Sequence, residues 1–247
     1  MGFTNLPLVE VSVRFTLEET LPFGLPFIGE LRDLLRGVHP AVEDAPFVLP
    51  PGSTMFLPTN IGQVGAVRFV GGPEGLILHV QPDLVGIFWS IASTPLQYPL
   101  HQSLFRQMST LLAEIRMATG MESVPVKSVN MTYAKLLPAP LGQAADVVER
   151  YYGNSLMVPH LHNVPQFHEL NVSWRTEQNI DLRFHVQYAS VQIGATQTAG
   201  YTISDSGGML LNGQSPMGGL EIVHTELTRY FVGSITKHAK KEWGFLE

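Results

Sequence analysis

The chain of 247 residues contains no cysteine. Disulfide bonds, thiol catalysis and thiolate metal sites are therefore excluded. Charged side chains are also scarce, at 15% of the residues, whereas hydrophobic side chains make up 45%. A chain of this length and composition buries a sizeable core. Because few charged side chains are available to oppose association with another protein chain, we expect a protein partner or a homo-oligomer.

Positive charge is in deficit, with 15 Lys and Arg against 21 Asp and Glu and a net charge of −6. We expect no nucleic-acid partner, because phosphate binding needs clustered cations. The densest basic cluster, Lys237, Lys240 and Lys241, falls in the predicted last turn of a helix, where cations offset the helix dipole. The N-terminal residues do not resemble a signal peptide, and no apolar run reaches membrane-spanning length. These features predict a soluble cytoplasmic protein without membrane contact.

Motifs that carry common enzyme chemistry are missing as well. The sequence has no glycine-rich phosphate loop, no His-Glu-x-x-His helix and no paired-carboxylate signature. We therefore expect no cofactor and assign no catalytic residue. Whether the chain is an enzyme stays open, and a non-enzymatic role is favoured.

What the sequence does contain is the same order of elements twice. Each half begins with an alternating strand, residues 8–16 or 126–137, followed by a helix at 27–35 or 144–152. Strands joined by tight turns follow, at 65–70, 76–80 and 84–91 and then at 168–176, 181–190, 197–204 and 209–211. Each half closes with a long amphipathic helix, residues 101–118 or 220–241. Residues 39–62 have no periodicity and predict an ordered loop.

The predicted fold class is therefore α+β with an internal duplication. We expect two similar β-α-β-meander-α halves, residues 1–120 and 121–247, whose antiparallel sheets are each covered by a long helix. His101 and His224 occupy parallel positions near the start of the two long helices. They could meet at a pseudo-symmetric centre and line a pocket between the halves with Trp89 and Tyr133. The alternative is that both histidines are ordinary core residues.

Two further clusters resemble known sites. His160 and His162, with His168 or Glu169, have the spacing of zinc ligands, but they lie in a predicted loop that gives no fixed geometry, so we expect no metal. The segment Asp205-Ser206-Gly207-Gly208 is similar to the nucleophile segment of trypsin-like proteases. A matching histidine segment is missing, and a tight turn accounts for these residues.

The order of elements resembles a sporadically distributed prokaryotic family of conserved hypothetical proteins of similar length. The resemblance is carried by residues 7–13 in the first strand, by 37–44 after the first helix, by Ile87-Phe88-Trp89, and by Phe231 and Ile235 in the closing helix. It covers most of the chain, but the motifs are structural and supply no catalytic residues. The patchy distribution of the family implies lateral transfer and a role in phage defence, mobile elements or a toxin–antitoxin-like system.

Two functions follow as hypotheses. The first is a non-enzymatic binding or regulatory subunit that acts through protein–protein contacts, since apolar residues are frequent in the predicted loops. The second is a small-molecule-binding or hydrolytic protein with a pocket between the halves. The identity of the partner or ligand cannot be read from these residues.

Overall fold

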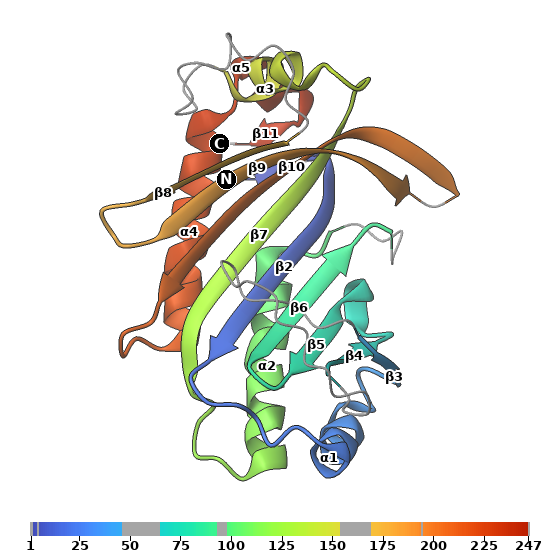
Figure 1. Cartoon of the computed structure of the whole chain (residues 1–247), viewed down its shortest axis with the longest axis vertical. Coiled ribbons are helices and arrows are strands. Elements are labelled where there is room, and N and C mark those ends of the chain that lie inside the picture. The colour runs from blue at the N-terminus through green and yellow to red at the C-terminus, as the bar shows by residue number, and fades with distance from the viewer. Residues whose placement is uncertain are drawn as a thin grey trace.

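The computed structural model describes residues 2–3, 5–45, 65–92, 98–153, 169–193 and 195–246. Within these ranges, nine strands form one antiparallel sheet in the order β3-β4-β5-β6-β2-β7-β10-β9-β8 (Figure 1). The helices and this sheet confirm the α+β class. The bounds are β2 (Leu8–Leu17), α1 (Leu25–Leu35), β3 (Ala41–Asp44), β4 (Val67–Val70), β5 (Ile77–Gln81), β6 (Leu84–Ser90), α2 (His101–Thr119), β7 (Val126–Pro138), α3 (Ala144–Tyr152), β8 (Glu169–Arg175), β9 (Asp181–Ile193), β10 (Thr196–Leu210), α4 (Pro216–Ser234) and α5 (Lys237–Glu242).

The centre of the sheet is the antiparallel pair β2 and β7. Each of these two strands has a second neighbour from later in the chain, β6 beside β2 and β10 beside β7. Because β2 and β7 pair with each other, the strands lie in one continuous sheet rather than in one sheet per half. A separate two-stranded sheet joins β1 (Gly2–Phe3) to β11 (Phe245–Leu246).

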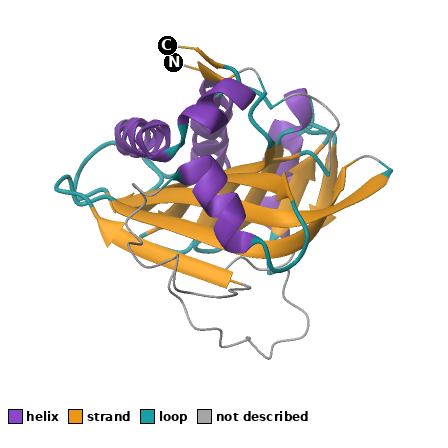
Figure 2. Cartoon of the chain, turned by 90° about the horizontal axis from the view of Figure 1, so that it is seen from above, coloured by secondary structure: helices purple, strands orange, loops and turns teal. Residues whose placement is uncertain are grey.

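One face of the large sheet carries the helices, which gather on one side of it in Figure 2. Val11, Val13 and Phe15 of β2 are fully buried there, as strand alternation predicts. They belong to a core that also takes in the apolar stripes of α2 and α4, including Met108 and Val223. No helix in the described ranges is both long and apolar enough to cross a membrane.

Alternation along residues 8–16 predicts that Val9 and Val11 lie on the same face of the sheet, but a bulge in β2 turns Val9 to the other face. The pairing of β2 with β7 shifts register between Leu8 and Glu10. A one-residue shift turns a side chain to the opposite face. Val9 therefore packs with Ala134 and Leu136 on the helix-free face instead of joining Val11 in the main core.

The Asp205-Ser206-Gly207-Gly208 segment is a strand, and the predicted turn there is wrong. β10 runs without interruption from Thr196 to Leu210. A Cβ atom on Gly207 would lie 3.1 Å from Leu182 and 3.2 Å from Val223 of α4. Gly207 is therefore needed for the close approach of α4, which is a common reason for glycine inside a strand.

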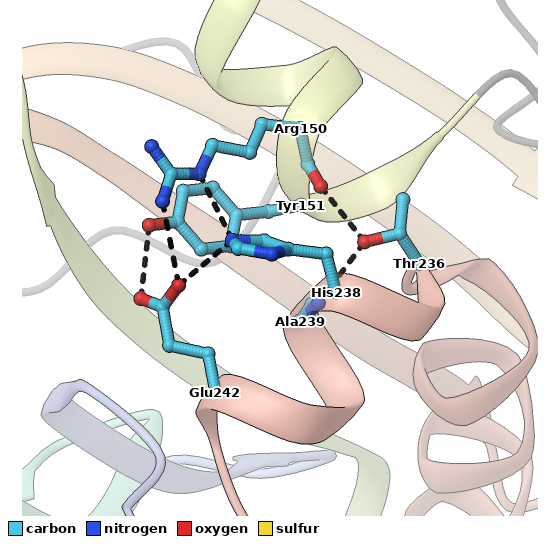
Figure 3. Close-up of polar contacts among 6 residues, drawn as sticks. All are labelled: Arg150, Tyr151, Thr236, His238, Ala239 and Glu242. Atoms are coloured by element: carbon cyan, nitrogen blue, oxygen red, sulfur yellow. Dashed lines mark hydrogen bonds and ion pairs between the residues drawn. The ribbon is translucent and has the colours of Figure 1, made fainter.

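The predicted closing helix, residues 220–241, is two helices. α4 ends at Ser234, Ile235 is extended, and α5 begins after Thr236, whose side chain accepts a hydrogen bond from the Ala239 N–H. The Thr236 hydroxyl also donates to the Arg150 carbonyl at 2.7 Å, which ties α5 to α3 (Figure 3). The end of α4 therefore turns toward α3 because Thr236 caps a new helix there.

Side chains of α3 and α5 close a second apolar core, in which Tyr152, Phe231 and Trp243 contact one another. This core encloses an ion pair between Lys135 and Asp205, each of which has an exposed fraction of 1%. On the outside of the same junction, Glu242 accepts a hydrogen bond from Tyr151 and forms an ion pair with Arg150 (Figure 3).

Candidate functional site

The helix-free face of the sheet, here called the open face, carries a continuous row of polar residues. Register partners link one residue of each strand across all nine strands, because every pair of neighbours in the row is directly opposite. From β3 to β8 the row reads Glu43, Arg68, His79, Gly86, Arg14, Asn130, Gly208, Asp181 and Arg175. An antiparallel sheet with helices on one side commonly faces water on the other. Within this row the exposure varies, from the buried His79 to the exposed Asp181 and Arg175.

A hollow of about 490 Å³ lies over the second part of this row and is here called the trough. Small residues leave the space open: Ser128 and Asn130 of β7, Ser206 and Gly208 of β10, and Ser173 of β8 line it. A Cβ atom on Gly208 would lie only 3.0 Å from the Asn130 amide, so this position cannot carry a larger side chain without crowding Asn130. The lining offers hydroxyl and amide groups that can both donate and accept hydrogen bonds.

Positive charge surrounds the trough. Arg14, Lys127 and Arg183 line it from β2, β7 and β9, and Asp181 is the one carboxylate among the described lining residues. Asp181 is already engaged by the fork of Arg175, with N–O distances of 2.6 and 2.9 Å. The trough therefore presents a net positive lining with hydrogen-bonding groups between the cations.

The first part of the row contains buried polar atoms that have no partner in the part of the chain that the structure describes. They are Nε of Arg14, Nε of Arg68, Nδ1 of His79 and, one row away, Oγ of Ser12. The side chains of Ser12 and His79 are fully buried. Native proteins satisfy most buried donors and acceptors, so a group of orphans on one face needs an explanation.

The His79 ring has a defined orientation. Its Nε2 lies 3.0 Å from Oε1 of Gln81, and the Gln81 amide donates to Asp83 at 2.8 Å. Because the Gln81 oxygen can only accept, Nε2 of His79 carries the hydrogen and Nδ1 keeps a free lone pair. Burial lowers the pKa of His79, and the positive charges of Arg68 and Arg14 lower it further.

The four residues predicted to line a pocket between the halves lie in one aromatic cluster on the helix side. The rings of His101 and His224 stack with centroids 3.9 Å apart. Tyr133 lies 6.5 Å from His224, and Trp89 connects to Tyr133 through Tyr98, at 5.5 and 6.3 Å. The structure thus brings His101, His224, Trp89 and Tyr133 together, but as rings in mutual contact. Their role in ligand binding stays a prediction.

The same surroundings keep the titratable groups of this cluster neutral. Burial lowers the pKa of His224 to about 4, with a further contribution from the charge of neighbouring His101. The pKa of His101 is also lowered by burial, against a smaller opposite effect of Glu221. Burial raises the pKa of Tyr133 well above its ordinary value. Two neutral, stacked imidazole rings are as typical of a packed core as they are of a site that contains a general base.

The weak metal candidates His160, His162 and His168 lie outside the described residues. Within the described ranges, no group of three His, Asp or Glu side chains is arranged to hold a metal ion. Ser206 faces the trough from the middle of β10, while Asp205 is paired with Lys135 in the second core. The side chains of Asp205 and Ser206 therefore lie on opposite faces of the sheet and cannot act together in one site.

Reasoning from the sequence missed the open face as a candidate site. Its signal was present in the polar positions of two alternating strands, Ser12, Arg14 and Thr16 in one and Ser128 and Asn130 in the other. Alternation alone indicates a second face on each strand, but it does not show which strands become neighbours. The row exists only once β2 and β7 pair.

Neither a protein-family model nor a curated protein sequence matches this chain.

Proposed function

We propose that the chain is a non-enzymatic binding subunit, built from two similar halves, that holds an acidic segment of a protein partner in the trough of its open face. The observation that carries this proposal is the positive, hydroxyl-rich lining of the trough, in which the single carboxylate is already paired. Such a lining complements carboxylates and peptide groups.

The strand order supports the two similar halves. Outward from the centre, the first half contributes β2, β6, β5, β4 and β3, and the second half β7, β10, β9 and β8. In both series the first strand of the half is central and the remaining strands follow in reverse chain order. The long helices α2 and α4 come directly after β6 and β10, which are the equivalent strands of the two series.

The dimensions of the trough favour an extended segment over a small molecule. The polar part of its lining reaches from Arg14 on β2 to Ser173 on β8, four strand spacings apart in the sheet. Neighbouring strands are about 4.8 Å apart, so this polar part spans about 19 Å, the length of roughly six extended residues. A long, shallow site with separated cations suits several carboxylates along a chain.

The overall charge supports a protein rather than a nucleic acid as the partner. With a net charge of −6, the molecule repels a polyanion everywhere except at local positive patches. An acidic peptide segment needs only such a patch. The phage-defence, mobile-element or toxin–antitoxin-like setting implied by the family resemblance stays a prediction.

The trough is tested with a fluorescein-labelled, glutamate-rich peptide of about eight residues, long enough to fill it. Fluorescence polarisation should show binding by the full chain that weakens at high salt. The double variant Lys127→Glu/Arg183→Glu should bind at least about tenfold more weakly, because both exposed cations of the lining are reversed.

The control for this experiment is Lys237→Glu/Lys241→Glu, two exposed residues on α5. Both double variants change the net charge by the same four units, from −6 to −10. The control should bind within about twofold of the parent, since general repulsion is screened by salt. No binding by the parent chain, or an equal loss in the two variants, would refute the acidic-segment proposal.

The alternative function, a small-molecule or hydrolytic site at His101, His224, Trp89 and Tyr133, has less support. Its residues do come together, but the stacked rings occupy the space between α2 and α4. Native mass spectrometry of the purified chain separates the two hypotheses. A bound small molecule that is lost on His224→Phe substitution would favour the alternative, and a second protein chain would favour the binding subunit.

A further inference from the structure

We infer that Arg14, Arg68 and His79 form a binding site for a compact oxyanion on the first half of the open face, and that His79 takes up a proton when the anion binds. The chemical class is a tetrahedral or planar oxyanion such as sulfate, phosphate or a carboxylate. The site adjoins the trough at Arg14, but it does not depend on the trough being occupied.

The three side chains share one row of the sheet. Arg68 is directly opposite His79, and His79 is opposite Gly86, which is opposite Arg14. Gly86 has no side chain, and a Cβ atom built on Gly86 would lie 3.5 Å from Cγ of Arg14. The stem of Arg14 therefore leans across β6 toward His79. The Arg14 guanidinium lies over the Phe88 ring, 5.1 Å from its centroid, and the His79 ring meets Phe88 edge-on with centroids 5.7 Å apart.

The two guanidinium groups have no counter-ion in the described part of the chain. No ion pair there involves Arg14 or Arg68, although Glu10 and Glu43 lie on the same face. Nε of each arginine is buried and without a hydrogen-bond partner. A buried N–H group without a partner is costly, and a bound anion removes that cost by accepting charge-assisted hydrogen bonds.

His79 supplies the third donor only when it is protonated. In the free protein its Nε2–H is directed at Gln81, so Nδ1 is a bare lone pair beside two positive charges. An anion placed among Arg14, Arg68 and His79 reverses the local field and favours the imidazolium ion. The proton comes from solvent and is bound at Nδ1, which then donates to the anion.

The charged groups around the His79 ring are consistent with a coupling between anion binding and protonation of His79. Arg68 on β4 and Arg14 on β2 disfavour protonation of His79 in the free state. Asp83 is engaged by the Gln81 amide and does not contact the ring directly. Glu10 acts on Arg14 instead, where its charge opposes the lowering of the pKa by burial. A bound anion is therefore the group that would change the charge balance at His79.

Isothermal titration calorimetry of the full chain with sulfate tests the site, because sulfate does not titrate near neutral pH. We expect saturable binding with a Kd of about 1 mM or below. The affinity should fall by up to about tenfold for each pH unit above neutrality, because His79 must take up a proton. Titrations in two buffers with different ionisation enthalpies should show proton uptake approaching one per sulfate.

Substitutions test whether sulfate binds at Arg68 and His79. Arg68→Gln should weaken sulfate binding at least about tenfold. His79→Gln should retain weak binding without pH dependence. Arg175→Gln, at the far end of the same row and paired with Asp181, is the matched control and should bind sulfate as the parent does. If His79→Gln is not folded by circular dichroism, the proton uptake of the parent chain decides the role of His79.

A glutamate-rich peptide added to the sulfate complex distinguishes the sources of the oxyanion. Displacement of sulfate by the peptide identifies a partner side chain as the natural source, and retention of sulfate identifies a free ion. Because Arg68 and His79 do not line the trough, loss of peptide binding in Lys127→Glu/Arg183→Glu with intact sulfate binding separates this site from the proposed function. Absence of sulfate binding, unchanged binding in Arg68→Gln, or binding without proton uptake would overturn the inference.

Discussion

His101 and His224 show how two residues from opposite halves of the chain become neighbours. His101 is the first residue of α2, where the positive end of the helix dipole disfavours a charged imidazole. His224 lies in α4, with Nε2 at 3.5 Å from the Thr228 hydroxyl. Stacked at 3.9 Å, the two rings cannot both be protonated without strong repulsion. The contact between the helices therefore depends on neutral histidines.

This stack predicts a loss of stability in mild acid. The pKa of His224 is about 4 in the folded protein, against an ordinary value of 6.5. The stabilising contribution is therefore complete above pH 6.5 and is lost as the pH falls toward 4, because the unfolded chain binds the proton first. Allowing for partial exposure of the ring, the free energy of unfolding should fall by on the order of 1 kcal/mol between neutral pH and about pH 5.

Urea unfolding of the parent and of His224→Phe at both pH values checks this expectation. The variant should show a smaller pH dependence, since the phenyl ring cannot be charged. Leu141→Ala, at an exposed position without a titratable side chain, should leave the dependence unchanged. An equal pH dependence in His224→Phe and the parent would mean that other groups cause the acid sensitivity.

At the scale of elements, α4 joins the two cores. The apolar face expected of an amphipathic closing helix is confirmed at Leu227 and Phe231, whose exposed fractions are 1% and 8%. Leu227 belongs to the main core, whereas Phe231 belongs to the second core beneath α3 and α5. The Phe231 ring stacks on Trp243 and carries the Lys135 ammonium group 4.5 Å from its centroid. One face of one helix thus supports two separate clusters.

Truncation of Phe231 tests this arrangement. Phe231→Ala should lower the free energy of unfolding by about 3–5 kcal/mol, because it leaves a cavity and exposes the Lys135–Asp205 pair. Leu141→Ala, at a position whose side chain is 56% exposed, is the control and should change stability by less than about 0.5 kcal/mol. A melting temperature of Phe231→Ala close to that of the parent would show that the second core does not support the fold.

The elements differ in how far the sequence could predict them. Strand alternation and helix periodicity placed β2, α2 and α3 to within a residue or two, because each is set by local pattern and by signals such as Gly120 after α2. The break at Ile235 and the passage of β10 through Gly207 were missed. Both depend on what packs against them, α3 in one case and α4 in the other. The trough was missed for a related reason, since its lining comes from six strands.

At the scale of the whole molecule, the two edge strands of the sheet, β3 and β8, determine whether the chain can associate with another chain by strand pairing. β3 carries Glu43 and Asp44, and β8 carries Glu169 and Arg175. Charged side chains discourage edge-to-edge pairing, so both edges of the sheet are protected although only 15% of the residues are charged. Assembly through a helix face or the open face is therefore favoured over strand pairing.

We still expect the purified chain to bind a second copy or a protein partner. A stable interface would bury about 1,600 Å² in total, and light scattering at micromolar concentration would report the larger mass. Self-association is our first expectation, and a foreign subunit recovered by pull-down is the alternative. A single species at 27.2 kDa with no recovered partner would contradict both.

The pairing of β2 with β7 at the centre of the sheet has a kinetic consequence. Val13 and Met131 are directly opposite in this pair although they are far apart in the chain. Contacts of such long range form slowly, because the entropy of closing a large loop is lost before any contact energy is gained. Each flanking meander closes shorter loops, so the two sides can form early. The sheet then becomes continuous only when β2 meets β7, and this late step leaves both central strands exposed to aggregation while the chain folds.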